Sequence, residues 1–204
     1  TAGGAVSGGI DPFFGLGDRL PDQAPLDEKP PKDHCLALFG PQGWGEELPI
    51  AIFSDFNCPY CKVLEQRLMD LRDSGAPVRL IWHELPLLGP SSVRYARAVL
   101  AARFLGAEAR ARAYLKTHVL RPGEDALGEM ALALDLLPDM LIREFNGARV
   151  SIALAESMAL GGRLGIPGTP GTVIGRTLVV GAISEADLKA LIALEQSEPR
   201  TLCA

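Results

Sequence analysis

Two cysteines three residues apart lie where a predicted strand leads into a predicted helix. Few folds have this arrangement. The apolar segment 49–53 leads through Ser-Asp-Phe-Asn to Cys58-Pro59-Tyr60-Cys61. Pro59 suits the first turn of a helix, where its missing N–H is not needed. Cys58 therefore lies where unpaired N–H groups and the positive end of the helix dipole favour a thiolate over a thiol. Because the thiolate attacks disulfides, the segment predicts thiol–disulfide exchange.

A strand, a helix and a strand follow one another around this motif. The apolar spacing predicts a helix over 59–73, which ends at Ser74-Gly75. Strands are predicted over 35–39, 49–53 and 78–82. The strands on either side of the helix then form a right-handed parallel crossover.

The composition changes to Ala, Leu and Arg with helical periodicity from residue 91 to about residue 165. The predicted helices are 91–105, 107–119, 125–136, 138–146 and 148–163. Strand signals return over 172–174 and 178–180, and a last helix over 184–196 begins with Ser184 as its N-cap. The predicted order is β-β-α-β, a helical block, then β-β-α.

The composition describes a globular chain and argues against two classes of partner. Hydrophobic residues make up 48% and charged residues 22% of the 204 residues. A formal charge of -5 gives no reason to expect nucleic acid or an anionic membrane as a partner. No apolar run reaches the roughly 18 residues that span a bilayer. Residues 1–33, rich in Gly, Pro and Asp, are predicted to form an extended N-terminal arm without a recognisable secretory signal.

The other two cysteines, Cys35 and Cys203, lie near opposite ends of the folded region. A disulfide between them would remove two free thiols beside a reactive pair, and in the chain-entropy model it would contribute roughly 4–5 kcal/mol. The alternative is two unlinked residues. We favour the disulfide as a structural one, although the spacing does not determine connectivity.

Three segments of this chain resemble the DsbA-like thiol–disulfide oxidoreductases. Residues 53–61 (FSDFNCPYC) are similar to that family's active-site segment, and residues 165–170 (GIPGTP) to its Thr–cis-Pro loop. Residues 85–92 are similar to its connection into a helical domain. The resemblance covers about 35–197 and implies an α/β chain, a thioredoxin fold with an inserted all-helical subdomain. The thioredoxin-fold domain would comprise 34–90 and 166–204, and the helical insertion 91–165.

By this resemblance the chain is a protein dithiol oxidase. Cys58 is the expected nucleophile and Cys61 the buried resolving thiol, with Pro59 and Tyr60 between them. A cis bond at Thr169-Pro170 would expose the backbone of Thr169 to an extended substrate peptide. The redox-active disulfide is the only cofactor expected, and no metal is expected.

The resemblance also implies partners and a compartment. The expected partners are reduced or misfolded substrate proteins and a membrane redox partner, with no nucleic acid. The absence of a long helix ahead of the domain favours a monomer. The compartment would be the periplasm or another oxidising extracytoplasmic space, with any signal peptide removed.

Two positions depart from the family pattern. Tyr60 replaces the histidine of the strongest family oxidants, so we expect a moderately oxidising site. Ile52 occupies the position where many thioredoxin-fold enzymes carry a buried acid. Asp55 is expected to support the start of the active-site helix, and a direct role in proton transfer is the alternative.

Other functions use the same cysteine pair. The nearest alternative with the same chemistry is an isomerase or reductase, which is kept in the reduced form and is often oligomeric. A copper-binding or chaperone module would use Cys58 and Cys61 as soft ligands, whereas a closed zinc site needs about four ligands. A glutaredoxin-type enzyme shares Cys-Pro-Tyr-Cys, but its fold has no room for the predicted helical block.

The remaining candidates are expected to be mostly structural. The candidates for an apolar rim that binds unfolded substrates are Phe56, Tyr60, Leu87 and Leu88. The alternative is that two or more of them are ordinary core residues. Structural roles are expected for the three histidines, which are His34, His83 and His118. Solvent-exposed helix faces are expected for the arginines at 94, 97, 103, 110 and 112.

Overall fold

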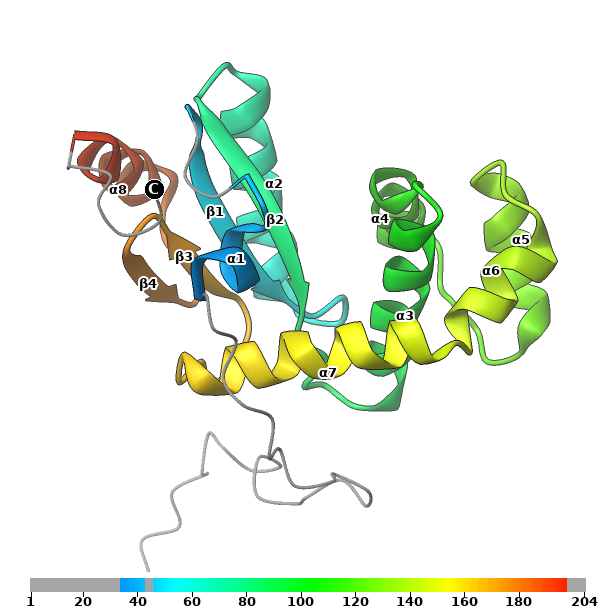
Figure 1. The fold of residues 1–204 in the computed structure, drawn as a ribbon. Helices are drawn as coiled ribbons and strands as arrows, with labels where there is room; N and C mark the ends of the chain where they lie inside the picture. The colour runs from blue at the N-terminus through cyan, green and yellow to red at the C-terminus, as the bar shows by residue number, and fades with distance from the viewer. Residues whose placement is uncertain (1–33, 43–45, 198–204) are drawn as a thin grey trace, which may run out of the picture. The chain divides into compact units, whose positions relative to one another are not determined.

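Strand β1 (Leu48–Ser54) lies inside a four-stranded sheet of order β2-β1-β3-β4. It pairs in parallel with β2 (Val78–Glu84) and antiparallel with β3 (Gly171–Ile174), and β4 (Thr177–Val180) pairs antiparallel with β3. This computed structural model describes residues 34–42 and 46–197. Figure 1 shows the sheet with its helices and, beside it, a separate group of helices.

The first face of the sheet is covered by helices α2 (Pro59–Asp73) and α8 (Glu185–Ser197). Side chains alternate between the two faces of a strand, so residues 48, 50 and 52 of β1 point to this side. They pack against leucines of α2 and against Leu188 and Ile192 of α8. This core holds the start of α2 against the end of β1, where the cysteine motif lies.

The second face of the sheet is covered by α1 (His34–Phe39) and α7 (Ala148–Arg163). Phe53 of β1 packs here in a cluster with Phe39 of α1 and Leu160 of α7. The two faces of β1 therefore belong to two different apolar clusters, and all seven of its residues are buried.

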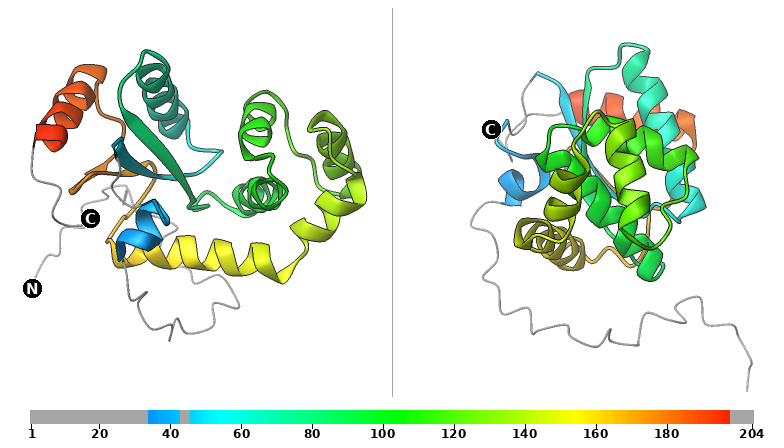
Figure 2. Two further views of the ribbon diagram at one scale, coloured as in Figure 1. Left: turned by 45° about the horizontal axis from the view of Figure 1, so that its top comes forward. Right: turned by 90° about the vertical axis from the view of Figure 1, so that its right-hand side faces the viewer.

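The helical group has an apolar core of its own. It is built from α3 (Pro90–Phe104), α4 (Glu108–Thr117), α5 (Glu124–Ala133) and α6 (Pro138–Phe145). The first half of α7 belongs to this core, and its second half reaches the sheet. Figure 1 and the left view of Figure 2 show α7, in yellow, running from one group to the other. The observed architecture is the expected thioredoxin fold with an all-helical insertion.

Most predicted elements are confirmed, and one is wrong. Helices over 59–73 and 148–163 have the predicted bounds, and the other predicted helices differ by at most three residues at either end. The segment predicted as a strand over 35–39 is instead part of α1. Leu38 and Phe39 are buried while Leu36 is exposed, and the Gly40 N–H donates to the Leu36 carbonyl as in a helical turn.

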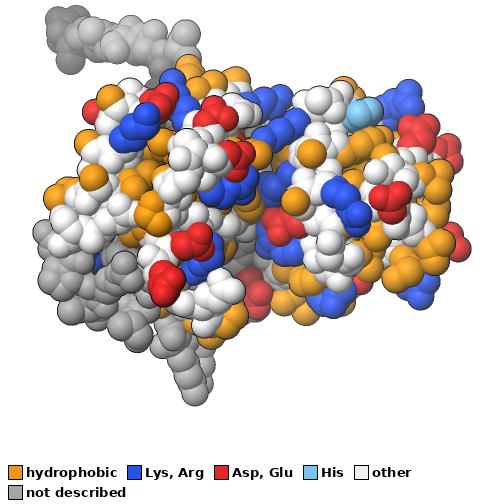
Figure 3. All heavy atoms as spheres, turned by 90° about the horizontal axis from the view of Figure 1, so that it is seen from above, with side chains coloured by type: hydrophobic (Ala, Val, Ile, Leu, Met, Phe, Trp, Pro, Cys, Tyr) orange, Lys and Arg blue, Asp and Glu red, His pale blue; other side chains and the backbone are white. Residues whose placement is uncertain are grey.

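Some predictions lie outside the described part of the chain. The N-terminal arm over 1–33 does so completely, and the Cys35–Cys203 disulfide does so because Cys203 is not among the described residues. Both stay predictions, as do the domain boundaries near residues 91 and 166. Among residues 34–42 and 46–197, no helix is long and apolar enough to cross a membrane. On the face drawn in Figure 3, acidic and basic side chains are interspersed without a large field of one sign.

Candidate active site

Cys58 is the N-cap of helix α2. Its backbone is extended (φ -81, ψ 117), and the Cys61 N–H donates to its sulfur at 3.4 Å. Pro59 begins the helix, and the Cys58 N–H donates to the Asp55 carbonyl at 3.0 Å, which closes the turn that connects β1 to α2. The Cys58 sulfur therefore takes the place of a capping oxygen and accepts a backbone N–H at the start of the helix.

Cys61 lies one helical turn further on and is completely buried. Both cysteines are thiols in this structure. Cys58 retains 4% of its surface exposed and Cys61 none. Burial raises the pKa of the Cys61 thiol to about 12. At pH 7 only about one Cys61 side chain in 10⁵ would be ionised without help.

The Thr169–Pro170 loop lies directly against both cysteines. The peptide bond between Thr169 and Pro170 is cis. The Cys58 thiol donates to the Thr169 carbonyl at 3.3 Å, although the two residues are 111 positions apart. The Thr169 side chain also acts on Cys61, because it lowers the pKa of that thiol against the effect of burial. The fold therefore brings the two motifs of the sequence into one site.

Asp55 supports this site from behind as a buried acceptor. One of its carboxylate oxygens accepts the Asn57 N–H at 2.8 Å and the Ser92 hydroxyl at 2.7 Å. Its other oxygen accepts the Leu88 N–H at 2.9 Å. These three bonds tie the turn before α2 to the connection between β2 and α3, so Asp55 fixes the position of the cysteine loop.

A comparison with protein families covers both the cysteine pair and the Thr169–Pro170 loop. The family model of the DSBA-like thioredoxin domain matches residues 49–193, which include the cysteine pair, the helical group and the Thr169–Pro170 loop. The chain belongs to the DsbA-like thioredoxin-domain family.

Solved structures and a curated protein are similar to this DsbA-like chain. A thioredoxin-like oxidoreductase from Silicibacter pomeroyi DSS-3 is 30% identical with a TM-score of 0.70, over 80% of this chain and 98% of the other. The catalytic domain of ScsC from Proteus mirabilis has the same fold at 24% identity, with a TM-score of 0.67 over 80% of this chain and 94% of the other.

The curated relative is the Na(+)/H(+) antiporter NhaA 1 of Salinispora arenicola, which is 32% identical over 165 residues. The match covers 78% of this DsbA-like chain but 24% of that protein. The chain therefore spans about a quarter of the length of the curated relative.

Two polar residues near Cys61 were not singled out by the sequence interpretation. Ser54, the last residue of β1, donates its hydroxyl to a carboxylate oxygen of Glu65 on α2. Both residues are buried. The buried residues of α2 are Cys61, Leu64, Glu65, Leu68 and Leu71. An acid within an otherwise apolar stripe was the signal that identifies Glu65.

The predicted apolar rim is divided between the surface and the core. Tyr60 is 66% exposed and Leu88 is 53% exposed beside the cysteine loop. Phe56 stacks on Tyr95 at 5.6 Å between ring centroids, and Leu87 packs into the core beneath the sheet. Tyr60 and Leu88 are thus the members of the predicted rim that an incoming chain can touch.

The contacts of His83 and His118 are with residues other than Cys58 and Cys61. His83 stacks on Phe53, and its Nε2 lies 2.9 Å from the Leu38 carbonyl, so it connects β2 to α1. His118 stacks on Tyr114. Across the described residues, no group of three or more His, Cys, Asp or Glu side chains is arranged to hold a metal ion.

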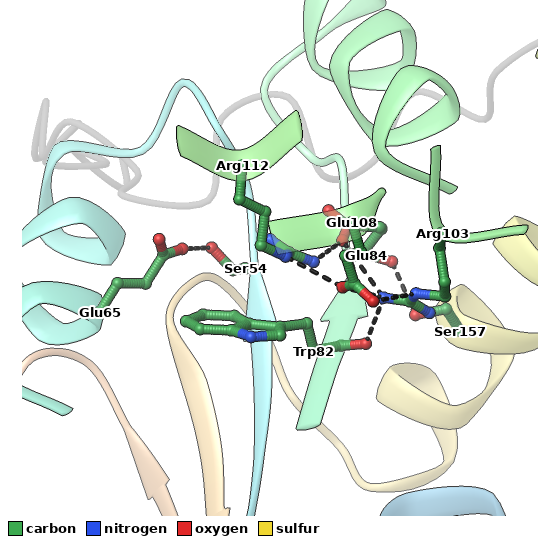
Figure 4. Close-up of polar contacts among 8 residues, drawn as sticks. All are labelled: Ser54, Glu65, Trp82, Glu84, Arg103, Glu108, Arg112 and Ser157. Atoms are coloured by element: carbon green, nitrogen blue, oxygen red, sulfur yellow. Dashed lines mark hydrogen bonds and ion pairs between the residues drawn. The ribbon is translucent and has the colours of Figure 1, made fainter. Parts of the chain in front are cut away.

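The prediction that the arginines are solvent-exposed is wrong for Arg112. Its guanidinium is buried and forms an ion pair with Glu84 at the end of β2, and with Glu108 at 3.0 Å. It lies over the Trp82 ring at 4.5 Å. Arg103 adds a second ion pair to Glu84 at 3.8 Å. Figure 4 shows this cluster between β2 and the helical group. The buried carboxylate of Glu84 requires these positive partners.

Proposed function

We propose that this DsbA-like chain is a protein dithiol oxidase that exchanges disulfides with folding substrate proteins through its Cys58-Pro59-Tyr60-Cys61 site. The observation that carries the proposal is the placement of the two sulfurs. Cys58 caps a helix and contacts the Thr169 carbonyl, while Cys61 lies behind it without access to solvent. Of these two buried cysteines only Cys58 retains exposed surface, 4%, and a two-step exchange requires one sulfur that can be attacked and one that is protected.

In the oxidised form the two cysteines share a disulfide. A substrate thiolate attacks the Cys58 sulfur, the Cys58–Cys61 bond breaks, and the Cys61 sulfur leaves with the electron pair and takes up a proton. A second substrate thiolate then attacks the substrate sulfur of the mixed disulfide and displaces Cys58 as a thiolate. The substrate dithiol thereby passes two electrons to the enzyme disulfide. The substrate thiols lose their protons before they attack, and on the enzyme Cys61 takes up a proton while Cys58 leaves as a thiolate.

Substrate binding in this proposal falls to Thr169 and Pro170. They lie against the Cys58 sulfur, so a peptide bonded to that sulfur must run beside them. Main-chain hydrogen bonds to an extended peptide tolerate many sequences. Exposed Tyr60 and Leu88 add apolar contact area for unfolded chains. Asp55 has a supporting role, since it holds the cysteine loop in place.

The proposal extends to partners and compartment. Reduced or misfolded proteins are the substrates, and a membrane redox partner reoxidises the Cys58–Cys61 pair. The similarity to part of a protein named as an antiporter supports a setting beside a membrane. An oxidising extracytoplasmic compartment such as the periplasm suits this direction of electron flow. A monomer is expected, and size-exclusion chromatography with light scattering tests that.

The deciding experiment is redox equilibration against glutathione, read by mass spectrometry of the Cys58–Cys61 pair. Because Tyr60 stands where the strongest oxidants have histidine, we expect a potential between those of thioredoxin and DsbA, about −270 and −120 mV. A value at or below thioredoxin's would contradict the oxidase and favour a reductase.

A second assay measures disulfide transfer to a substrate. The substrate is a reduced, unfolded protein that forms disulfides when it folds. The oxidised chain should remove two substrate thiols per turnover, and Cys58→Ser should remove none. Faster repair of a scrambled substrate by the reduced chain, without net oxidation, would favour an isomerase. Stoichiometric copper after purification without reductant would favour the metal-binding alternative.

A further inference from the structure

Cys61 needs a route for its proton, because its sulfur is sealed from solvent. In each direction of the exchange this sulfur either leaves as a thiolate or attacks as one. A completely buried thiol cannot exchange its proton directly with water. Ile52, at the position where related folds carry a buried acid, lies in the apolar core between the sheet and α2.

Ser54 and Glu65 form a polar path that begins at this sulfur. Ser54 at the end of β1 is 3% exposed, and its hydroxyl donates to a carboxylate oxygen of Glu65. The same hydroxyl lies near enough to the Cys61 sulfur to lower the pKa of that thiol, against the effect of burial. Glu65 follows Cys61 by four residues on α2, so both side chains lie on the same face of the helix. Figure 4 shows Ser54 and Glu65 pointing toward each other.

We infer that Glu65, acting through the Ser54 hydroxyl, accepts and returns the proton of Cys61 during thiol–disulfide exchange. This inference rests on the proposed function, because it concerns the step in which Cys61 forms or breaks its bond to Cys58. Ser54 is the group of this path that lies next to the reacting sulfur. Glu65 is a positioning residue that orients the Ser54 hydroxyl and stores the proton.

Two protons and one pair of electrons move when Cys61 attacks. The Cys61 S–H proton passes to the Ser54 oxygen while the Ser54 O–H proton passes to the Glu65 carboxylate. The resulting Cys61 thiolate attacks the Cys58 sulfur of a mixed disulfide, and the partner leaves as a thiolate with the bonding electrons. In the oxidase direction Cys61 leaves as the thiolate, and the same two protons move back.

The proposed path has the same number of hydrogen bonds in both of its states. With Cys61 as a thiol, the S–H donates to Ser54 and the Ser54 O–H donates to Glu65. With Cys61 as a thiolate, the protonated Glu65 donates to Ser54 and the Ser54 O–H donates to the sulfur. No polar atom of the three side chains loses its partner, so the transfer requires no rearrangement of the core.

The charged group that faces Glu65 from the helical insertion is Arg112 of α4. Its guanidinium interacts electrostatically with Glu65 as well as with Glu84 and Glu108. The other neighbours of Glu65 in the path are Ser54 of β1 and Cys61 of α2 itself. Arg112 therefore supplies the positive charge that the Glu65 side chain meets from the helical insertion.

The test separates two steps in single-turnover kinetics. The reduced chain is mixed with glutathione disulfide between pH 5 and pH 9, and quenched samples are resolved by mass spectrometry. Formation of the mixed disulfide at Cys58 reports the first step, and closure of the Cys58–Cys61 disulfide reports the second. Variants are Glu65→Gln and Ser54→Ala, with Asp70→Asn as the control because Asp70 is an exposed acid on the same helix.

We expect Glu65→Gln to form the mixed disulfide within about twofold of the wild-type rate and to close it roughly 10² times more slowly near pH 6, the lower range of general-base effects. Its closure rate should rise about tenfold per pH unit, because hydroxide then replaces the internal base, while the wild-type profile is flatter. Ser54→Ala should show the same profile, and the double variant should be no slower than either single variant.

Two results distinguish this inference from the function on which it rests. Unchanged closure rates and pH profiles in Glu65→Gln and Ser54→Ala, with a normal first step, would overturn the relay and leave the oxidoreductase intact. Failure of the wild-type chain to form a mixed disulfide at all would refute the proposed function instead. If Glu65→Gln does not fold, Ser54→Ala alone decides, since it removes the connecting hydroxyl and keeps the carboxylate.

Discussion

Removing the guanidinium of Arg112 should destabilise the fold strongly, because it leaves a buried carboxylate without its main partner. Glu84 is 1% exposed and Arg112 is 7% exposed. Burial raises the pKa of Glu84, and the charge of Arg112 opposes that shift. Breaking one side of a buried ion pair costs about 3–5 kcal/mol. Since Arg103 still lies 3.8 Å from Glu84, we expect Arg112→Met to lose about 3 kcal/mol, the lower end of that range.

Urea unfolding followed by circular dichroism measures this loss. With a slope of about 2 kcal/mol per molar urea, the midpoint should fall by roughly 1.5 M. Arg110→Met is the matched control, because Arg110 on the same helix pairs at 3.6 Å with Asp135, and both side chains are exposed. An exposed pair of this kind contributes about 0–1 kcal/mol.

A double-mutant cycle with Glu84→Gln isolates the ion pair. Because the second change removes the stranded charge, the double variant should regain about 2 kcal/mol relative to the sum of the single losses. The Arg112→Met loss should also be smaller at pH 5 than at pH 8, since a carboxylate with a raised pKa takes up a proton in the folded state. A single loss below about 1 kcal/mol, or additive losses, would refute the reasoning.

Three other changes test the surroundings of the site. Burial lowers the pKa of His83 to about 4 from its ordinary 6.5, so the unfolded chain alone gains a proton between these values. The unfolding free energy should therefore drop by about 3 kcal/mol as the pH falls through that window. In His83→Gln the unfolding free energy should depend less on pH, and equal pH slopes in the variant and the wild type would contradict this role of His83. Asp55→Ala leaves three donors without an acceptor, so thermal unfolding should show a loss of about 2–4 kcal/mol, whereas no loss would mean that Asp55 does not support the loop. Gly171→Ala would bring a Cβ to 2.6 Å from the Ile166 side chain, so we expect a loss of about 1–3 kcal/mol in urea and slower turnover, and a neutral outcome would show that Ile166 moves aside freely.

The parts of this fold that follow from local pattern could be predicted. Pro59 and the Ser74-Gly75 ending determine the bounds of α2, and Ser184 caps α8 through its bond to the Asp187 N–H at 3.1 Å. The cysteine motif and the Thr169-Pro170 loop were recognisable in the same way. In each case neighbouring residues carry the whole signal.

What could not be predicted depends on contacts between distant residues. The short apolar run 35–39 suits a strand or a helix equally, and packing beneath the sheet selects the helix. Arg112 looked like an exposed helix residue, and only the folded chain brings it to Glu84 from 28 positions away. Glu65 carried a local signal as an acid in an apolar stripe, but its partner Ser54 lies on another element.

Selective alkylation of the reduced chain tests most directly whether the two thiols have different roles. A thiol-specific alkylating reagent is added to the native protein at pH 7, and the modified residues are located over time by peptide mass spectrometry. We predict rapid modification of Cys58, whose sulfur lies at the start of α2, and none of Cys61 until the protein is unfolded. Equal labelling of the two residues, or a Cys58 that reacts only in denaturant, would contradict the account.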